Sequence, residues 1–386
     1  MIKSHSMFCQ MLNLFSRYEF QKAVQEHKGE RHARGITCWD QFVAMLFCHL
    51  AKAKSLREII GGMASQGTFL YHLGTKLMKR SSLAYANAHR PWPIYQTVFY
   101  QLLAKCHPLQ RGHKFRFKNK LLSIDASVID LCASIFDWAQ FRRTKGAVKL
   151  HLALDHDGHL PSYAHITTGK IHEVRIARKL KWPAGTILTF DRAFVDFAWF
   201  AALIRHGVWF VTRAKENLAY HVVETLLPPL NRNILADEII ELTGFYSAQK
   251  NPYYLRRIEA IDPKTGDAIV LLTNHLRFGA STISAIYKDR WQIEILFRNL
   301  KQNLRIKTFV GTSANALHIQ IWTALIAYLL LWYLKMKSRF SWSLSNLVAL
   351  VRMNLFNRKD LWTWLNDPFP QPIDYAAQLP LFYTIT

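Results

Sequence analysis

The order of strand-type and helix-type segments after residue 120 limits the folds open to this chain. Apolar, β-branched runs at 120–132, 185–194 and 208–215 are typical of strands, and 147–169 reads as two strands around a turn at Asp157-Gly158. Helix-type segments at 172–180 and 195–207 separate the later strands. A hairpin followed by alternating strand and helix predicts an α/β fold.

Different patterns flank this region on both sides. Residues 1 to about 110 have helical spacing: one segment at 37–63 ends in a Gly pair, and two short helices at 80–103 are broken by Pro91 and Pro93. Residues from about 214 to 276 predict β-hairpin material turning at 263–266, which we interpret as an insertion. The helical segment is either a DNA-binding bundle or a plain helical subdomain.

The chain is strongly basic, with a net charge of +24, which calls for a polyanionic partner or for a reason to repel itself. Nucleic acid is the first candidate partner, and an anionic membrane surface is the second. Residues 1–120 alone hold 19 Lys and Arg against 5 Asp and Glu. In "RGHKFRFKNK" (111–120) five cations alternate with Phe115 and Phe117. This stretch suits a segment lying along a phosphate backbone and equally well a solvated basic linker.

The cysteines and the apolar runs exclude other classes of protein. Five widely spaced cysteines without a CxxC pair predict neither a disulfide scaffold nor a zinc ribbon, and indicate a reduced cytosolic protein. The most apolar run, 321–334, is shorter than the roughly 20 residues that a membrane span needs. We therefore expect a buried helix there and no membrane partner.

The segment "YKDRWQIEILFRNLKQNL" (287–304) concentrates polar side chains on one predicted helix. At about 100° per residue, Tyr287, Arg290, Glu294 and Lys301 fall on one stripe roughly 60° wide, beside an apolar face. The plain interpretation is a solvated face on which Glu294 pairs with Arg298. The other interpretation is a carboxylate surrounded by cations and a phenol.

Three carboxylates in the order strand, strand, helix favour the second interpretation. Asp125 in "SIDAS" and Asp191 in "TFDRAF" lie at or near predicted strand ends, and Glu294 lies on the helix. An RNase-H-like sheet places its first and fourth strands side by side, so these carboxylates would meet. Carboxylates in such a site suit two Mg²⁺ ions that act on a phosphodiester. Asp130 and Asp137 are alternatives to Asp125 but fit the strand end less well.

The spacing Tyr-x2-Arg-x3-Glu-x6-Lys resembles the signature of the DDE transposases of insertion sequence family four. "SIDASVIDLC" and "TFDRAFVDF" are similar to that family's two Asp blocks, with Ala193 and Phe194 as departures from Asp-Arg-Gly-Tyr. The stretches "FSRYEFQKAVQEHKGERHARGITCWDQFVAMLFCHL" and "SLAYANAHRPWPIY" resemble the N-terminal domain of one branch. The resemblance covers nearly the whole chain, and Ala193 leaves the tight turn after Asp191 in question.

The resemblance implies an architecture and a set of residue roles. It implies an all-helical DNA-binding domain at 1–112, and an RNase-H-like catalytic domain at 113–386 with a β-rich insertion at about 214–276 and C-terminal helices at about 314–360. It implies Asp125, Asp191 and Glu294 as ligands of Mg²⁺, with Mn²⁺ as a substitute. It further implies DNA contacts by Tyr287, Arg290, Lys301, Trp291 and Arg298, with Trp291 a candidate to receive a flipped base.

The implied reaction is nicking at the inverted-repeat ends of a mobile element, followed by transfer of the 3′-OH ends to target DNA. The implied partner is double-stranded DNA, bound by a homodimer in a synaptic complex of two ends in a prokaryotic cytoplasm. Two rivals are an RNase-H-fold nuclease and a catalytically inactive, transposase-derived DNA-binding protein. The "HDGH" sequence (156–159) is also a metal candidate, but its predicted position in a hairpin turn favours a structural role.

Overall fold

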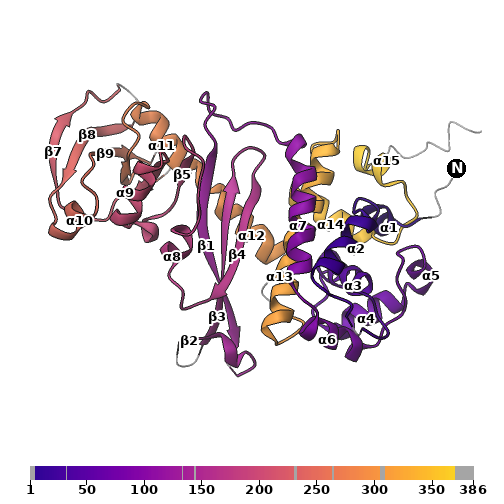
Figure 1. Ribbon diagram of the computed structural model, residues 1–386. Coiled ribbons are helices and arrows are strands. Elements are labelled where there is room, and N and C mark those ends of the chain that lie inside the picture. The colour runs from indigo at the N-terminus through magenta and orange to yellow at the C-terminus, as the bar shows by residue number, and fades with distance from the viewer. Residues whose placement is uncertain are drawn as a thin grey trace, which may run out of the picture.

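A computed structural model describes residues 5–369, except 32, 133, 143–144, 230–232, 263–264 and 305–308. A helical lobe lies beside a lobe built on one large sheet (Figure 1). The long strands β1, β3 and β4 form the side of the sheet that is nearest to the helical lobe. The expected mixture of a helical N-terminal part and an α/β part is confirmed at this level.

Seven helices form the N-terminal part of the chain, as its helical periodicity predicts. They are α1 (Met7–Leu12), α2 (Arg17–Glu26), α3 (Cys38–Leu50), α4 (Leu56–Ala64), α5 (Gly67–Leu70), α6 (Arg80–His89) and α7 (Pro93–Cys106). The helical spacing over 37–63 is confirmed, and the segment forms two helices. Thr37 forms a capping box at the start of α3, and Ser55 caps a separate α4 that contains both glycines. Two well-capped starts in one apolar stretch therefore give two helices.

The strands form one ten-stranded sheet. They are β1 (Leu121–Cys132), β2 (Gln140–Arg142), β3 (Lys145–Asp155), β4 (Leu160–Thr168), β5 (Ile187–Thr189), β6 (Trp209–Arg213), β7 (Tyr220–Thr225), β8 (Ile234–Leu242), β9 (Leu255–Ile261) and β10 (Ala268–Thr273). The order is β2-β3-β1-β5-β6-β10-β9-β8-β7, and β4 pairs with β3. Strand β1 is antiparallel to β3 and parallel to β5. The segments expected to carry Asp125 and Asp191 are therefore neighbours.

The expected β-rich insertion contributes the far end of this sheet. Strands β7 to β10 pair antiparallel with one another, and β10 pairs with β6, so the sheet runs on without a break. The predicted hairpin of β9 and β10 is present, while residues 263–264 of its turn lie outside the described part of the chain. Helix α10 (Phe245–Lys250) lies between β8 and β9 in the sequence.

Helices cover the two faces of the sheet differently. Helices α8 (Glu173–Ala177) and α9 (Phe197–Arg205) pack on one face, with side chains of β1, β5 and β6. Helix α11 (Ala280–Asp289) packs on the opposite face. Helix α12 (Gln292–Asn303) follows α11 and places its apolar side chains against β1 and β3. The face of α11 and α12 is the one that concerns function.

Helix α13 (Ala314–Lys337) joins the two lobes through a shared core. Its side chains belong to one hydrophobic cluster with α1 to α3, α6 and α7, with β1, β3 and β4, and with α14 (Leu344–Asn354) and α15 (Leu361–Asn366). Trp322 of α13 is 1% exposed. The N-terminal helices therefore share their core with C-terminal ones, and the proposed boundary near residue 112 crosses that core.

By length and composition alone, α13 is sufficient to cross a bilayer, and 89% of its most apolar window is buried inside the protein. The helix is 24 residues long and contains the apolar run 321–334, and the burial expected for that run is confirmed. Its apolar residues surround the helix because neighbours cover every side.

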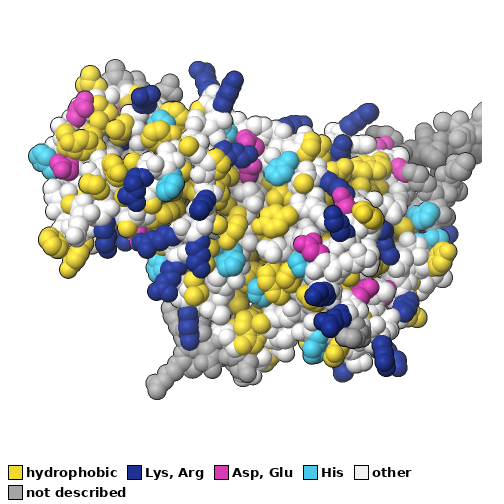
Figure 2. Space-filling model, in the orientation of Figure 1, with side chains coloured by type: hydrophobic (Ala, Val, Ile, Leu, Met, Phe, Trp, Pro, Cys, Tyr) yellow, Lys and Arg dark blue, Asp and Glu magenta, His cyan; other side chains and the backbone are white. Residues whose placement is uncertain are grey.

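The space-filling view shows many Lys and Arg side chains and few Asp and Glu (Figure 2).

Candidate active site

Asp125 lies in the middle of β1, so the position expected for it at or near a strand end is wrong. It shares a face with Ser123, because side chains alternate along a strand. Its carboxyl is mostly buried and accepts a hydrogen bond from the backbone N–H of Ala126, at 2.7 Å to Oδ1. Asp130 is exposed and, by the same alternation, lies on the other face. The side chain of Asp137 lies outside the described part of the chain. The geometry therefore favours Asp125 over Asp130.

Asp191 follows β5 and begins a short 3₁₀ turn, Arg192–Phe194. Its Oδ1 accepts the backbone N–H of Ala193 at 2.9 Å, and its carbonyl accepts the hydroxyl of Thr212 on β6 at 3.2 Å. The turn forms with Ala193 in place of glycine, because residue 193 does not adopt a positive φ. The question raised by this departure from the family pattern is thereby resolved.

The polar stripe of 287–304 lies on two helices rather than the one that periodicity predicts. Helix α11 ends at Asp289, and α12 begins at Gln292. Across the junction, the N–H groups of Arg290, Trp291 and Ile293 bond carbonyls three residues back, as in a tightened turn. The junction separates Tyr287 from Glu294 along the chain and turns the start of α12 toward β1.

Glu294 and Lys301 lie on the side of α12 that faces β1. Lys301 Nζ donates to the carbonyl of Val128, at 3.1 Å. Arg290 Nη2 donates to Glu294 Oε1 at 2.8 Å. Glu294 therefore pairs with Arg290, four residues before it, and not with Arg298, four residues after it. The side chain of Arg298 is exposed.

The three carboxylates act on one another electrostatically. Burial, together with the negative charges of Asp191 and Glu294, raises the pKa of Asp125 to about 7, although the Ala126 N–H and Arg290 oppose the shift. Burial also raises the pKa of Tyr287, on which Arg290, Asp191 and Arg213 act in addition. Residues from β1, β5, β6, α11 and α12 thus form one cluster.

Each carboxylate of the cluster uses one oxygen within the protein. These are Asp125 Oδ1, Asp191 Oδ1 and Glu294 Oε1. Among the described residues, the second oxygen of each makes no hydrogen bond. Three carboxylates with open oxygens, whose charges oppose one another, fit a divalent cation that prefers oxygen ligands.

Trp291 stands at the junction, with its side chain 57% exposed. It lines a cavity of about 730 Å³ together with Tyr287 and Arg290, and with Ile261, Ile269 and Leu271 of the insertion. The exposed indole therefore shares a cavity with Tyr287, Arg290 and side chains of the inserted strands.

A chain of hydrogen bonds ties the junction to the sheet and to the linker. His156 Nε2 lies 2.6 Å from Ser123 Oγ, and His156 Nδ1 lies 2.8 Å from Asp289 Oδ2. The other oxygen of Asp289 accepts from Lys114 Nζ at 2.6 Å. These contacts hold the pKa of Asp289 at about 2, although burial opposes that shift. The chain joins β1, the β3–β4 turn, the α11–α12 junction and residue 114.

The "HDGH" sequence does turn between β3 and β4, with positive φ at Gly158 and His159. His156, His159 and Asp289 each offer one ligand atom within 4.8 Å of the others. However, both ring nitrogens of His156 and both oxygens of Asp289 already have partners. The structural role that the sequence favoured for this turn agrees with these contacts.

Sequence reasoning did not identify four further residues of this region: Ser123, Asp289, Lys114 and Arg213. Ser123 lies two residues before Asp125, so strand alternation was the signal that could have found it. Asp289 and Lys114 are 175 residues apart in the sequence, and nothing local connects them. Arg213 ends the strand that follows Asp191, a position that parallel pairing of β5 and β6 brings to the same edge.

Two family models match the chain. The one described as a transposase DDE domain matches residues 116–330, which include Asp125, Asp191 and Glu294. The one described as a domain of unknown function (DUF4372) matches residues 3–76.

Relatives that carry transposase names also match. The protein y4zB of Sinorhizobium fredii is 31% identical over 72% of this chain and 78% of its own length. One named for insertion sequence element IS5377 of Geobacillus stearothermophilus is 28% identical over 63% of this chain and 64% of its own. Among solved structures, a chain of the piggyBac transposase synaptic complex with hairpin DNA aligns with 91% of this chain and 78% of its own, at 10% identity and a TM-score of 0.46. From the DDE domain and the y4zB match, this chain belongs to the family of DDE transposases.

Proposed function

We propose that this chain is the working transposase of an insertion sequence: it binds the inverted-repeat ends, nicks them, and transfers the 3′-OH ends to target DNA. The observation that carries the proposal is the meeting of Asp125, Asp191 and Glu294, from β1, the end of β5 and α12, in one electrostatic cluster. The family match independently supports a transposase.

The three carboxylates are proposed to hold Mg²⁺, with Mn²⁺ as a substitute. Bound metal would activate the attacking hydroxyl and stabilise the leaving oxygen of the phosphodiester. Asp125 and Asp191 are held in place by the backbone N–H groups of Ala126 and Ala193. Glu294 is held by Arg290. These contacts orient one oxygen of each carboxylate and leave the other for the cation.

Arg290 is proposed to bind a phosphate of the end DNA, together with Tyr287, Lys301 and the exposed Arg298. Its Nε is buried and has no hydrogen-bond acceptor among the described residues. A guanidinium with an unused donor suits a phosphate oxygen. The guanidinium also lies over the Tyr287 ring, 5.5 Å from the centroid, which fixes its plane.

The cavity beside Trp291 is proposed to receive a base flipped from the duplex end. Its wall of Ile261, Ile269 and Leu271 is apolar, and Trp291 offers a π-face for stacking. Stacking on an aromatic side chain offsets part of the few kcal/mol that unstacking costs.

We also propose an RNase-H-like core, a DNA-binding N-terminal part and a homodimeric assembly. The order β4-β3-β1-β5-β6, antiparallel then parallel, supports an RNase-H-like core with the insertion at 214–276. A DNA-binding role for residues 1–112 is supported by the charge of that part. Two ends require two active sites, which supports a homodimer acting on DNA in a prokaryotic cytoplasm.

The test is Mg²⁺-dependent nicking of a labelled duplex that carries the terminal repeat. Glu294→Gln should keep the fold and DNA binding while nicking falls by several orders of magnitude, because metal stabilisation of the transition state is worth several kcal/mol. Glu224→Gln is the matched control, since Glu224 is an exposed carboxylate on β7. Nearly unchanged nicking by Glu294→Gln would refute the site. Nicking by wild type without joining, when paired ends are supplied, would support the nuclease rival.

A further inference from the structure

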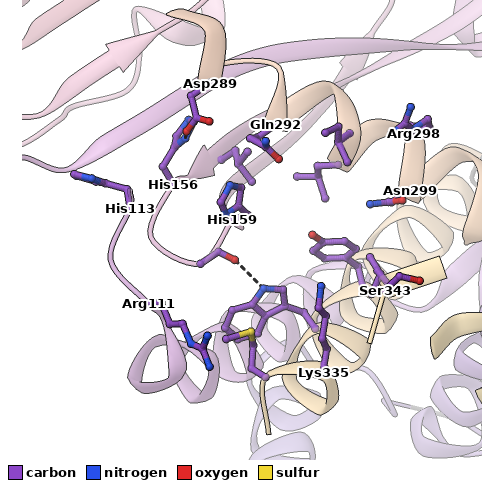
Figure 3. Close-up of a pocket in the computed structure, with 18 of the residues that line it drawn as sticks. Arg111, His113, His156, His159, Asp289, Gln292, Arg298, Asn299, Lys335 and Ser343 are labelled. Carbon is purple, nitrogen blue, oxygen red and sulfur yellow. Dashed lines mark hydrogen bonds and ion pairs between the residues drawn. The ribbon is translucent and has the colours of Figure 1, made fainter. Parts of the chain in front are cut away.

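A second cavity, of about 890 Å³, lies on the side of α12 away from Glu294. Its walls come from the linker, the β3–β4 turn, α12, the end of α13 and the start of α14 (Figure 3). We call this cavity the α12 groove; its polar lining includes Arg111, His159, Gln292, Arg298, Lys335 and Ser343.

The α12 groove is strongly positive. Arg111, Lys114, Arg298 and Lys335 line it, against one carboxylate, that of Asp289. Both oxygens of Asp289 are already engaged by Lys114 and His156. Within the described part of the chain, Arg111, Arg298 and Lys335 form no ion pair with a carboxylate. These three cations therefore remain available to an external anion.

Contacts on either side of the α12 groove fix its shape in advance. Trp332 Nε1 of α13 donates to the carbonyl of Gly158 at 2.8 Å, the contact drawn in Figure 3. Gln110 Nε2 bonds the carbonyl of Asp157 at 2.6 Å. Positive φ values at Gly158 and His159 turn the backbone, and Figure 3 shows the His159 ring directed into the groove. The walls of the α12 groove are therefore already ordered before a ligand binds, which reduces the entropy cost of binding.

The α12 groove borders the cavity beside Trp291. The two cavities share Lys114, Asp289, Gln292 and Ile295 as lining residues. At about 100° per residue, Gln292 and Ile295, which line the groove, lie on a different side of α12 from Glu294. A strand leaving Arg290 and Trp291 would thus reach the groove by passing the N-terminal end of α12.

We propose that the α12 groove holds the phosphodiester backbone of one DNA strand as it leaves the active site, with Arg111 and Lys335 contacting phosphates. The inference rests on the proposed function and adds to it a second contact surface on the far flank of α12. Several separate cations along an open groove match a chain of phosphates better than one small anion. The outward cations Arg116 and Lys118 extend the positive surface along the linker.

The test compares the full-length double variant Arg111→Gln/Lys335→Gln with Arg205→Gln/Lys250→Gln. The control pair removes the same charge from exposed positions on α9 and α10, on the other face of the sheet. Binding of a labelled terminal-repeat duplex is measured across a salt series. The groove variant should lower the slope of log K against log[salt] by about 2, and weaken binding roughly 10- to 30-fold near 0.15 M salt. The control should shift neither value.

Two further measurements separate this proposal from its alternatives. Arg111→Lys/Lys335→Arg should restore the salt slope, because each position keeps its positive charge. An unchanged slope in the groove variant overturns the inference, while loss of nicking in Glu294→Gln still supports the proposed function. If Zn²⁺ alone stabilises the protein through His159 and the slope is unchanged, the groove is a metal site instead.

Discussion

Arg290 Nη2 lies 2.8 Å from Glu294 Oε1, so the cation expected to hold DNA phosphate also neutralises a carboxylate expected to hold metal. The two residues flank the α11–α12 junction, and Arg290 reaches back over Tyr287. The pair therefore couples the proposed DNA contact to the proposed metal site.

The first prediction concerns Arg290→Gln. Removing the guanidinium should weaken binding of end DNA and lower the salt slope of log K by about 1, because one phosphate contact is lost. Binding of Mn²⁺ without DNA should tighten, because Glu294 loses its competing partner. The checks are a salt series of DNA affinities and Mn²⁺ titration by electron paramagnetic resonance. A salt slope equal to that of wild type would exclude the phosphate contact.

A second prediction concerns the three carboxylates acting as a unit. Asp125→Asn and Asp191→Asn should each reduce nicking as severely as Glu294→Gln, because every ligand is needed for the same metal centre. The double variant Asp125→Asn/Asp191→Asn should be little worse than either alone. Single-turnover nicking rates measure this directly. Multiplicative losses would show that the residues act independently.

The third prediction concerns pH and Asp125, whose pKa in the folded protein is raised from 3.8 to about 7. The unfolded chain loses this proton first as pH rises, so the buried carboxyl lowers stability progressively between about pH 4 and 7. Asp125→Asn should therefore stabilise the metal-free protein at pH 8, by at most about 4 kcal/mol, and by less at pH 5.5. Denaturant unfolding at both pH values measures the difference. Mg²⁺ should stabilise wild type more than the variant. If Asp125→Asn raised the free energy of unfolding equally at pH 5.5 and pH 8, the raised pKa would not belong to Asp125.

The fourth prediction concerns His156, whose side chain is fully buried between Ser123 and Asp289. His156→Ala should lower the free energy of unfolding by about 2–4 kcal/mol, because it leaves a hydroxyl and a carboxylate without a partner. His221→Ala, at an exposed position on β7, should change it by less than about 0.5 kcal/mol. Equal effects of the two changes, measured by urea unfolding, would show that the hydrogen-bond chain contributes no stability.

The fifth prediction concerns residues 1–112 expressed alone. Their core includes buried side chains of α13, such as Trp322, which the fragment lacks. The fragment should therefore bind a hydrophobic dye and unfold without a cooperative transition, whereas the full chain unfolds cooperatively. A sharp thermal transition of the fragment would show that the N-terminal helices form an independent domain.

Local patterns were sufficient where the determining interactions are themselves local. Alternation in 121–132 predicts β1 and the face of Asp125, and the Asp157-Gly158 turn predicts the β3–β4 hairpin. One error has a local origin as well. The backbone tightens at Arg290 and Trp291, so the one helix expected over 287–304 became two. Helical periodicity continues across this break, which explains why the pattern did not reveal it.

The sequence by itself determined the segments, their chemistry and the family, because hydrophobic period, turn residues and the Tyr-Arg-Glu-Lys spacing are written in consecutive positions. Only the tertiary structure decided that Arg290 rather than Arg298 pairs with Glu294, and that His156 joins Ser123 to Asp289. It alone placed α13 in the core of the N-terminal helices and opened the groove between Arg111 and Lys335. These contacts join residues far apart in the chain, and their partners are selected by the packing of whole elements, which no local pattern encodes.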